Sequence, residues 1–112
     1  IPKIHVIGDA IDAGDMSKSA HSAASLGYVC GAAVGQFLIG EAPTIPDYEN
    51  VCYFIVAQDH GLKVGGSYRP KDGRIVGKKG FSSAVGETDS VRKATAFDGV
   101  NWYQQTTQKL FG

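Results

Sequence analysis

The chain begins with a β-branched run that leads directly into a Gly-Asp-Ala turn and then into a long helix. Residues 3–7, Lys-Ile-His-Val-Ile, lie between Pro2 and Gly8 and predict a strand buried on at least one face. Asp9 follows at once. Because ligands bind at the carboxyl ends of strands in α/β folds, Asp9 is placed to accept a hydrogen bond from a sugar or polyol hydroxyl. A turn aspartate that caps the next segment is the equal alternative.

The helix that follows has a face of small residues. Ser17-Lys18-Ser19 offers an N-cap, and the helix is expected to run to about Ile39, where Gly40 closes it. Small residues at roughly four-residue spacing predict close packing against a sheet or another helix; they are Ala20, Ala24, Gly27, Gly31 and Gly35. Polar residues interrupt the run, so no membrane span is expected.

The start of this helix is a candidate anion site. The first amide groups of a helix lack partners and carry partial positive charge, which suits a phosphate, a carboxylate or an anionic reduced flavin. Lys18 and Ser19 lie at this tip. An ordinary capped helix with Lys18 in solvent is the alternative.

The second half of the chain predicts an antiparallel meander followed by a helix. After a linker over 41–46, residues 51–56 are apolar on both faces and predict a central or covered strand. Further segments are a turn over 58–61, a strand over 62–69, a hairpin turn over 71–74, a return strand over 75–76 and an irregular stretch over 81–86. Glu87-Thr88-Asp89 begins a helix to the chain end, with Gly99 softening its middle.

Composition narrows the function. Eleven basic and eleven acidic residues give zero net charge, and Lys78-Lys79 is too short a basic patch to favour nucleic acid or an anionic membrane. Two cysteines without C-x-x-C spacing and three scattered histidines predict no metal site. Hydrolase and kinase motifs are absent from the sequence, and no secretory leader precedes the first predicted strand.

Each cysteine allows a structural interpretation. Cys52 lies in the predicted strand over 51–56, where a cysteine is most often a small apolar filler with an inert thiol. The alternative is one half of a redox disulfide, which needs a partner sulfur in restrictive geometry. Cys30 lies mid-helix, and we expect it to be a packing residue.

Four segments taken together resemble one known family, the flavoprotein subunit of flavocytochrome c sulfide dehydrogenase. They are residues 4–10, residues 16–19, residues 49–53, and the terminal stretch from Trp102-Tyr103 to Phe111-Gly112. The similarity spans essentially the whole chain, in order and with similar spacing. It matches only the carboxyl-terminal part of that subunit, a glutathione-reductase-like flavoprotein.

This resemblance implies an α+β fold in two parts. Residues 1–46 would supply the N-terminal strand and long helix from the end of an FAD-binding domain, plus a linker. Residues 47–112 would form the flavin-binding or interface domain, an antiparallel meander with a C-terminal helix.

The resemblance also implies site residues. Asp9, with Gly8 and Ala10, would hold the flavin ribityl chain, and the backbone around Lys18, Ser19 and Ala20 would stabilise negative charge on reduced flavin. Cys52 matches the family's cysteine of a redox-active disulfide beside the flavin. His21 stands where an aromatic residue is usual, and Cys30 where a small apolar residue is usual.

The implied function is oxidoreductase chemistry in a longer protein. Electrons would pass from sulfide through the disulfide and FAD to a c-type cytochrome subunit in the periplasm. The partner cysteine and the phosphate-binding motif would belong to the missing N-terminal FAD domain, so this chain holds a partial FAD site and is expected to be inactive alone.

Two other functions stay open. One is a stand-alone, non-catalytic binding or dimerisation module that retains the fold, with a homodimer covering apolar surface that lost its partner. The other is a sulfide:quinone oxidoreductase acting at a membrane, which the neutral charge and the lack of an amphipathic carboxyl-terminal anchor disfavour.

Overall fold

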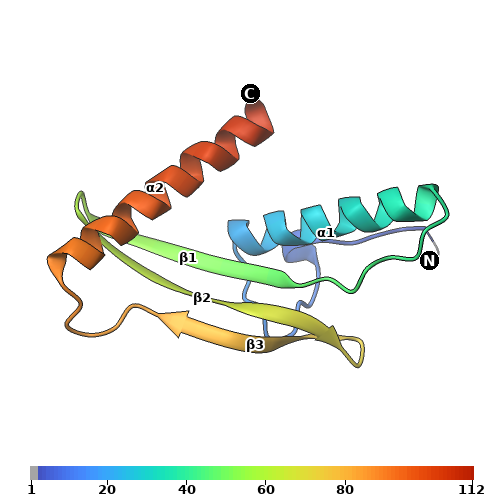
Figure 1. Cartoon of the computed structure of the whole chain (residues 1–112), viewed down its shortest axis with the longest axis horizontal. Helices are drawn as coiled ribbons and strands as arrows, with labels where there is room; N and C mark the ends of the chain where they lie inside the picture. The colour runs from blue at the N-terminus through green and yellow to red at the C-terminus, as the bar shows by residue number, and fades with distance from the viewer. Residues whose placement is uncertain (1–2) are drawn as a thin grey trace. The chain divides into compact units, whose positions relative to one another are not determined.

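The computed structural model describes residues 3–112 and confirms an α+β fold (Figure 1). The elements in chain order are the 3-10 helix η1 (Gly8–Ala10), α1 (Ala20–Leu38), β1 (Tyr48–Ala57), β2 (His60–Lys71), β3 (Arg74–Ser82) and α2 (Asp89–Phe111). Contacts divide the chain into two compact units: the first is 1–51 with 65–80, and the second is 52–64 with 81–112. The expected domain boundary between residues 46 and 47 stays a prediction.

The predicted strand over residues 3–7 does not form. These residues lie outside the sheet, and the side chains of Ile4 and Val6 are 60% and 58% exposed. A strand needs a neighbour for its amide and carbonyl groups, and within residues 3–112 no strand pairs with this segment. The apolar, β-branched composition of residues 3–7 was therefore not sufficient to predict a strand.

Helix α1 has the predicted ends but not the predicted packing. Ser19 is the N-cap, and Gly40 follows the helix with a φ of +77°. However, Cβ atoms built on Gly27, Gly31 and Gly35 would meet nothing within 4 Å, so the small-residue face is open rather than tightly packed. In the described part of the chain, no helix is long and apolar enough to cross a membrane.

The meander is confirmed, with strand order β1-β2-β3 (Figure 1). Asp72 and Gly73 both have positive φ, 50° and 75°, as a two-residue hairpin turn requires. The expectation that residues 51–56 form a central or covered strand is wrong, because β1 is an edge strand and Phe54 is 52% exposed. Although β1 has apolar residues on both faces, the structure leaves some of them exposed.

The core of the first unit lies between α1, the loop before it and the hairpin of β2 and β3. Ala13, Met16 and Leu26 form its buried cluster, and Tyr68 and Ile75 pack against it. The preceding loop is fastened to β3 by two hydrogen bonds of 3.0 Å, from the Asp15 amide to the Ile75 carbonyl and from the Gly77 amide to the Asp15 carboxylate. A side chain at Gly14 would collide with the Ile75 carbonyl.

In the second unit, α2 packs closely on strand residues through glycines. A Cβ on Gly99 would lie 3.0 Å from Tyr53 and 3.1 Å from Ile55, and one on Gly61 would overlap the Ala96 backbone. Gly99 therefore permits close packing rather than softening the helix, which continues unbroken through it. The N-cap Thr88 is as predicted, whereas β3 extends to Ser82, so the irregular stretch begins later than expected.

Candidate functional site

The predicted site residues of the first unit form a turn that faces the start of α1. Gly8, with φ of +68°, opens the 3-10 turn Gly8–Ala10, and a Cβ on it would touch Ala23 of α1. Asp9 is exposed, and in the described residues no group donates a hydrogen bond to its carboxylate. The turn therefore presents an available acidic acceptor beside a helix N-terminus.

Lys18 joins the two halves of this predicted site. Its ammonium group donates a hydrogen bond of 2.7 Å to the backbone carbonyl of Asp9. The exposed Lys18 side chain thus ties the turn to the segment that leads into α1. Ser19 and Ala20 follow as N-cap and first residue of α1, where amide groups lack intrahelical acceptors.

A buried polar network fixes the start of α1 on β1, and sequence analysis missed it. Asn50 is 2% exposed; its carbonyl oxygen accepts a hydrogen bond of 2.6 Å from the Ser19 hydroxyl, and its amide nitrogen donates one of 2.6 Å to the Ser17 hydroxyl. The Ser19 hydroxyl oxygen also accepts from the Ser22 amide at 3.0 Å. The sequence did not predict this network, because Asn50 lies 31 and 33 residues from these serines and directly before the strand expected over residues 51–56.

Two further side chains of α1 contact the backbone of β1. A ring nitrogen of His21 lies 3.3 Å from the Glu49 carbonyl, and the Ser25 hydroxyl accepts a hydrogen bond of 3.2 Å from the Glu49 amide. These contacts satisfy backbone groups at the outer edge of an edge strand. His21 therefore has a structural partner on β1.

Cys52 lies on β1 in the second unit and is half-buried. Neither it nor Cys30 forms a disulfide within residues 3–112. Cys30 is half-buried on α1 in the first unit. The structure thus places the seven predicted site residues in two groups, with six around the turn and α1 and Cys52 in the other unit.

Two tyrosines of β1 have raised pKa values. Burial raises the pKa of Tyr48. Burial also raises the pKa of Tyr53, next to Cys52, and the negative charge of Asp98 adds to that effect. Both hydroxyls therefore stay protonated to a higher pH than an ordinary tyrosine does. Neither serves as a general base near neutral pH.

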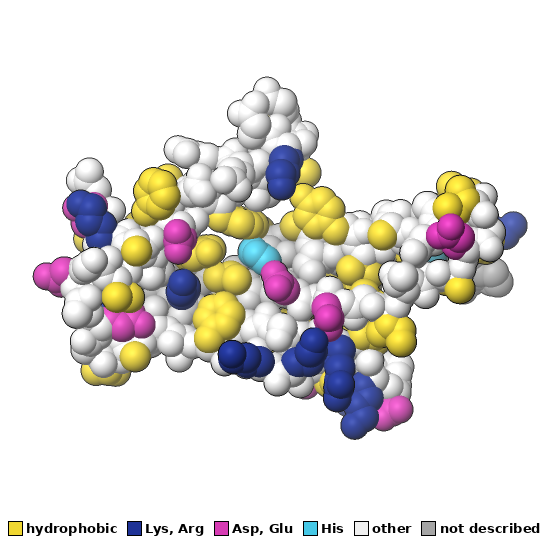
Figure 2. Space-filling view, in the orientation of Figure 1, with side chains coloured by type: hydrophobic (Ala, Val, Ile, Leu, Met, Phe, Trp, Pro, Cys, Tyr) yellow, Lys and Arg dark blue, Asp and Glu magenta, His cyan; other side chains and the backbone are white. Residues whose placement is uncertain are grey.

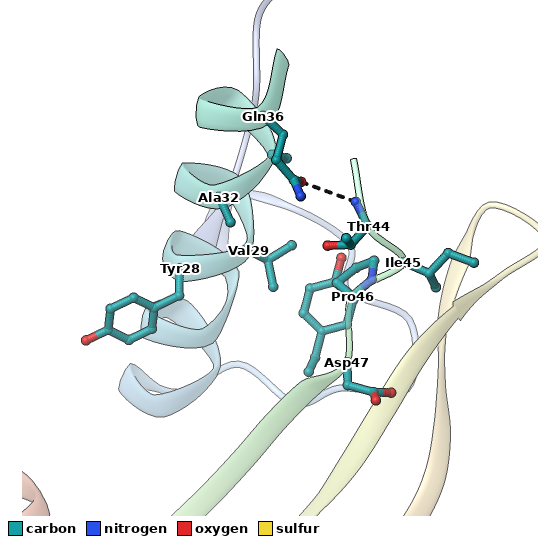
Figure 3. A pocket seen from close by; sticks show the side chains of 10 residues that line it. Tyr28, Val29, Ala32, Gln36, Thr44, Ile45, Pro46 and Asp47 are labelled. Carbon is teal, nitrogen blue, oxygen red and sulfur yellow. Dashed lines mark hydrogen bonds between the residues drawn. The ribbon is translucent and has the colours of Figure 1, made fainter. Parts of the chain in front are cut away.

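A groove in the first unit holds none of the predicted site residues. It has a volume of about 530 Å³ and lies between α1 and residues 44–48, with Tyr28, Val29 and Ala32 on the helix side (Figure 3). Gln36 ties the two sides by accepting a hydrogen bond of 3.2 Å from the Thr44 amide. Among the described residues, no group of three or more His, Cys, Asp and Glu side chains could hold a metal ion.

The fold is thus an α+β domain in which an acidic turn adjoins a helix N-terminus. A family model, described as flavocytochrome c sulphide dehydrogenase, flavin-binding, matches residues 44–111. The match covers more than half of the chain, which therefore belongs to this family. It includes Cys52, the sheet and α2, whereas the turn at Gly8–Ala10 and the start of α1 lie before the matched residues.

Proposed function

We propose that the chain forms one side of the FAD site of a periplasmic sulfide-oxidising flavoprotein. The observation that carries the proposal is the family match over residues 44–111, which includes Cys52. The turn at Gly8–Ala10 and the start of α1 supply the flavin contacts. The rest of the site, including the phosphate-binding motif, belongs to an N-terminal FAD domain outside this chain.

The residues of the first unit fit such a group chemically. The Asp9 carboxylate, with Gly8 and Ala10 beside it, accepts hydrogen bonds from the ribityl hydroxyls. The amide groups of the first turn of α1, around Lys18, Ser19 and Ala20, stabilise negative charge that develops on reduction. When bound there, FAD would supply the capacity to accept two electrons and to pass them singly to a c-type haem.

Cys52 is one half of a redox disulfide with a cysteine of the N-terminal domain. Hydrosulfide attacks one sulfur of this bond; the disulfide S–S bond breaks, a persulfide S–S bond forms, and the other cysteine leaves as a thiolate. The attacking sulfur keeps its hydrogen, and its electron pair ends as the pair on the thiolate. Two electrons are thereby made available for transfer out of the disulfide site.

Co-expression with the matching N-terminal segment tests the proposal. The complex should purify with the visible absorbance of flavin, and mass spectrometry without reductant should find Cys52 linked to a cysteine of that segment. Cys52→Ser should abolish the cross-link, whereas Cys30→Ser should leave it intact. A colourless complex in which Cys52 is always a thiol would overturn the redox role.

The second candidate function is a stand-alone binding module that dimerises. Large apolar side chains at the end of α1 favour it, since Phe37, Leu38 and Ile39 are 64%, 76% and 71% exposed. Light scattering of the chain alone distinguishes the candidates when combined with co-expression. A stable dimer that takes up neither flavin nor the N-terminal segment supports the binding module.

A further inference from the structure

The hairpin of β2 and β3 has one face built from cations. Side chains alternate along a strand, and the turn at Asp72-Gly73 sets Lys71 opposite Arg74. Tyr68 and Ile75 point to the core. The opposite face then carries the group we call the basic face: Arg69, Lys71, Arg74 and Lys78. Dark blue side chains gather over this end of the sheet in Figure 2.

These cations are poorly neutralised within the chain. Lys78 forms an ion pair of 2.9 Å with Asp47. In the described part of the chain, no acidic side chain pairs with Arg69, Lys71 or Arg74, all of which are exposed. The chain as a whole has zero net charge, so the positive charge is a local feature.

The placement also opposes stability. Like charges directly opposite each other across an antiparallel pair are destabilising, and Lys71 and Arg74 take those positions at the hairpin end. Core packing does not require either cation, because the side chains that pack inward are Tyr68 and Ile75. The hairpin tip thus presents positive charge that the core does not require, and negative charge on a partner would complement it.

We propose that the basic face docks onto an acidic patch of a partner protein. Arginine matches carboxylates through paired hydrogen bonds, and the face contains two arginines. It offers no aromatic side chain on which bases could stack. Nor does it offer a large exposed apolar side chain to enter a bilayer, since Val76 is half-buried. This inference is independent of the redox chemistry proposed above.

A labelled polyglutamate peptide is the probe, and its binding is measured by fluorescence anisotropy over a salt series. The variant Lys71→Glu/Arg74→Glu reverses the charge at the tip, and Lys3→Glu/Lys109→Glu makes the same change in net charge at exposed sites outside the hairpin. We expect the first to weaken binding about tenfold and the second less than about twofold, with the difference shrinking as salt rises. Circular dichroism confirms that both variants fold.

Two parallel titrations use a DNA duplex and phosphatidylglycerol vesicles. Equal weakening by both charge variants would overturn the proposal, because net charge and not the basic face would then govern binding. Binding to DNA or vesicles that is tighter than to polyglutamate, and lost with Lys71→Glu/Arg74→Glu, would also overturn it. That outcome would assign the face to a different macromolecule.

Discussion

The ammonium group of Lys18 donates a hydrogen bond of 2.7 Å to the backbone carbonyl of Asp9. This contact ties the turn at Gly8–Ala10 to the segment that leads into α1. Both residues are exposed, so the bond contributes little to global stability. Its contribution is to positioning.

Replacing Lys18 should therefore weaken flavin retention more than folding. In the complex co-expressed with the N-terminal segment, Lys18→Met frees the Asp9 carbonyl and loosens the turn. We expect a lower flavin-to-protein ratio by absorbance, with the free energy of unfolding changed by about 1 kcal/mol or less. Lys109→Met is the control on α2. Unchanged flavin content in both variants would show that the contact does not position the turn.

Removing the buried amide of Asn50 should destabilise the first unit strongly. Asn50→Ala takes away the carbonyl oxygen that accepts from the Ser19 hydroxyl and the amide group that donates to the Ser17 hydroxyl, and it leaves a gap where the buried Asn50 side chain lay. We expect a loss of about 2 kcal/mol or more in urea unfolding. Asn101→Ala, which removes a longer bond of 3.3 Å at an exposed site, should cost far less. Equal losses would contradict the network's importance.

The two helices should respond oppositely to glycine replacement. Alanine favours a helix over glycine by about 1 kcal/mol, and Gly31→Ala meets no neighbour, so it should raise the melting temperature. Gly99→Ala places a methyl group 3.0 Å from Tyr53, so it should lower the melting temperature despite the same helix preference. A higher melting temperature for Gly99→Ala would refute the close packing of α2 on β1.

Glu87 should make the free energy of unfolding depend on pH in the acidic range. Its pKa is lowered from the ordinary 4.5, chiefly by the hydrogen bond that its carboxylate accepts from the Ala84 amide at 2.8 Å, and also by the charge of Arg92. A lowered folded-state pKa gives stability that is present above pH 4.5 and lost as the pH falls through the lowered value.

Melting temperatures from neutral pH to below pH 4.5 test this dependence. Glu87→Gln should flatten the acid limb, because the neutral side chain no longer titrates. Asp59→Asn, at an exposed pair with Lys93, should leave that limb nearly unchanged. An unaltered acid limb in Glu87→Gln would locate the acid-sensitive group elsewhere.

Local signals predicted the elements well. Ser19 and Thr88 cap the two helices, and Asp72-Gly73 makes the hairpin turn, because each acts within a few residues of itself. The strand predicted over residues 3–7 does not form, because a strand needs a neighbouring strand that no local pattern specifies.

Long-range packing was harder to predict. The contacts of Asn50 with Ser17 and Ser19 span more than thirty residues, and nothing near Asn50 in sequence indicates them. Gly99 shows the same limit, since glycine in a helix reads as soft until the strand it contacts is known. The basic face was not predicted either, because its cations lie on two strands and come together only through the pairing of β2 with β3.

Anaerobic addition of sulfide to the flavin-containing complex tests the redox role of Cys52 directly. We expect visible flavin absorbance to fall in the complex with unaltered Cys52 and in Cys30→Ser, whereas Cys52→Ser should retain flavin but should not be bleached by sulfide. Bleaching of Cys52→Ser at the unaltered rate would contradict the assignment of Cys52 to the redox disulfide.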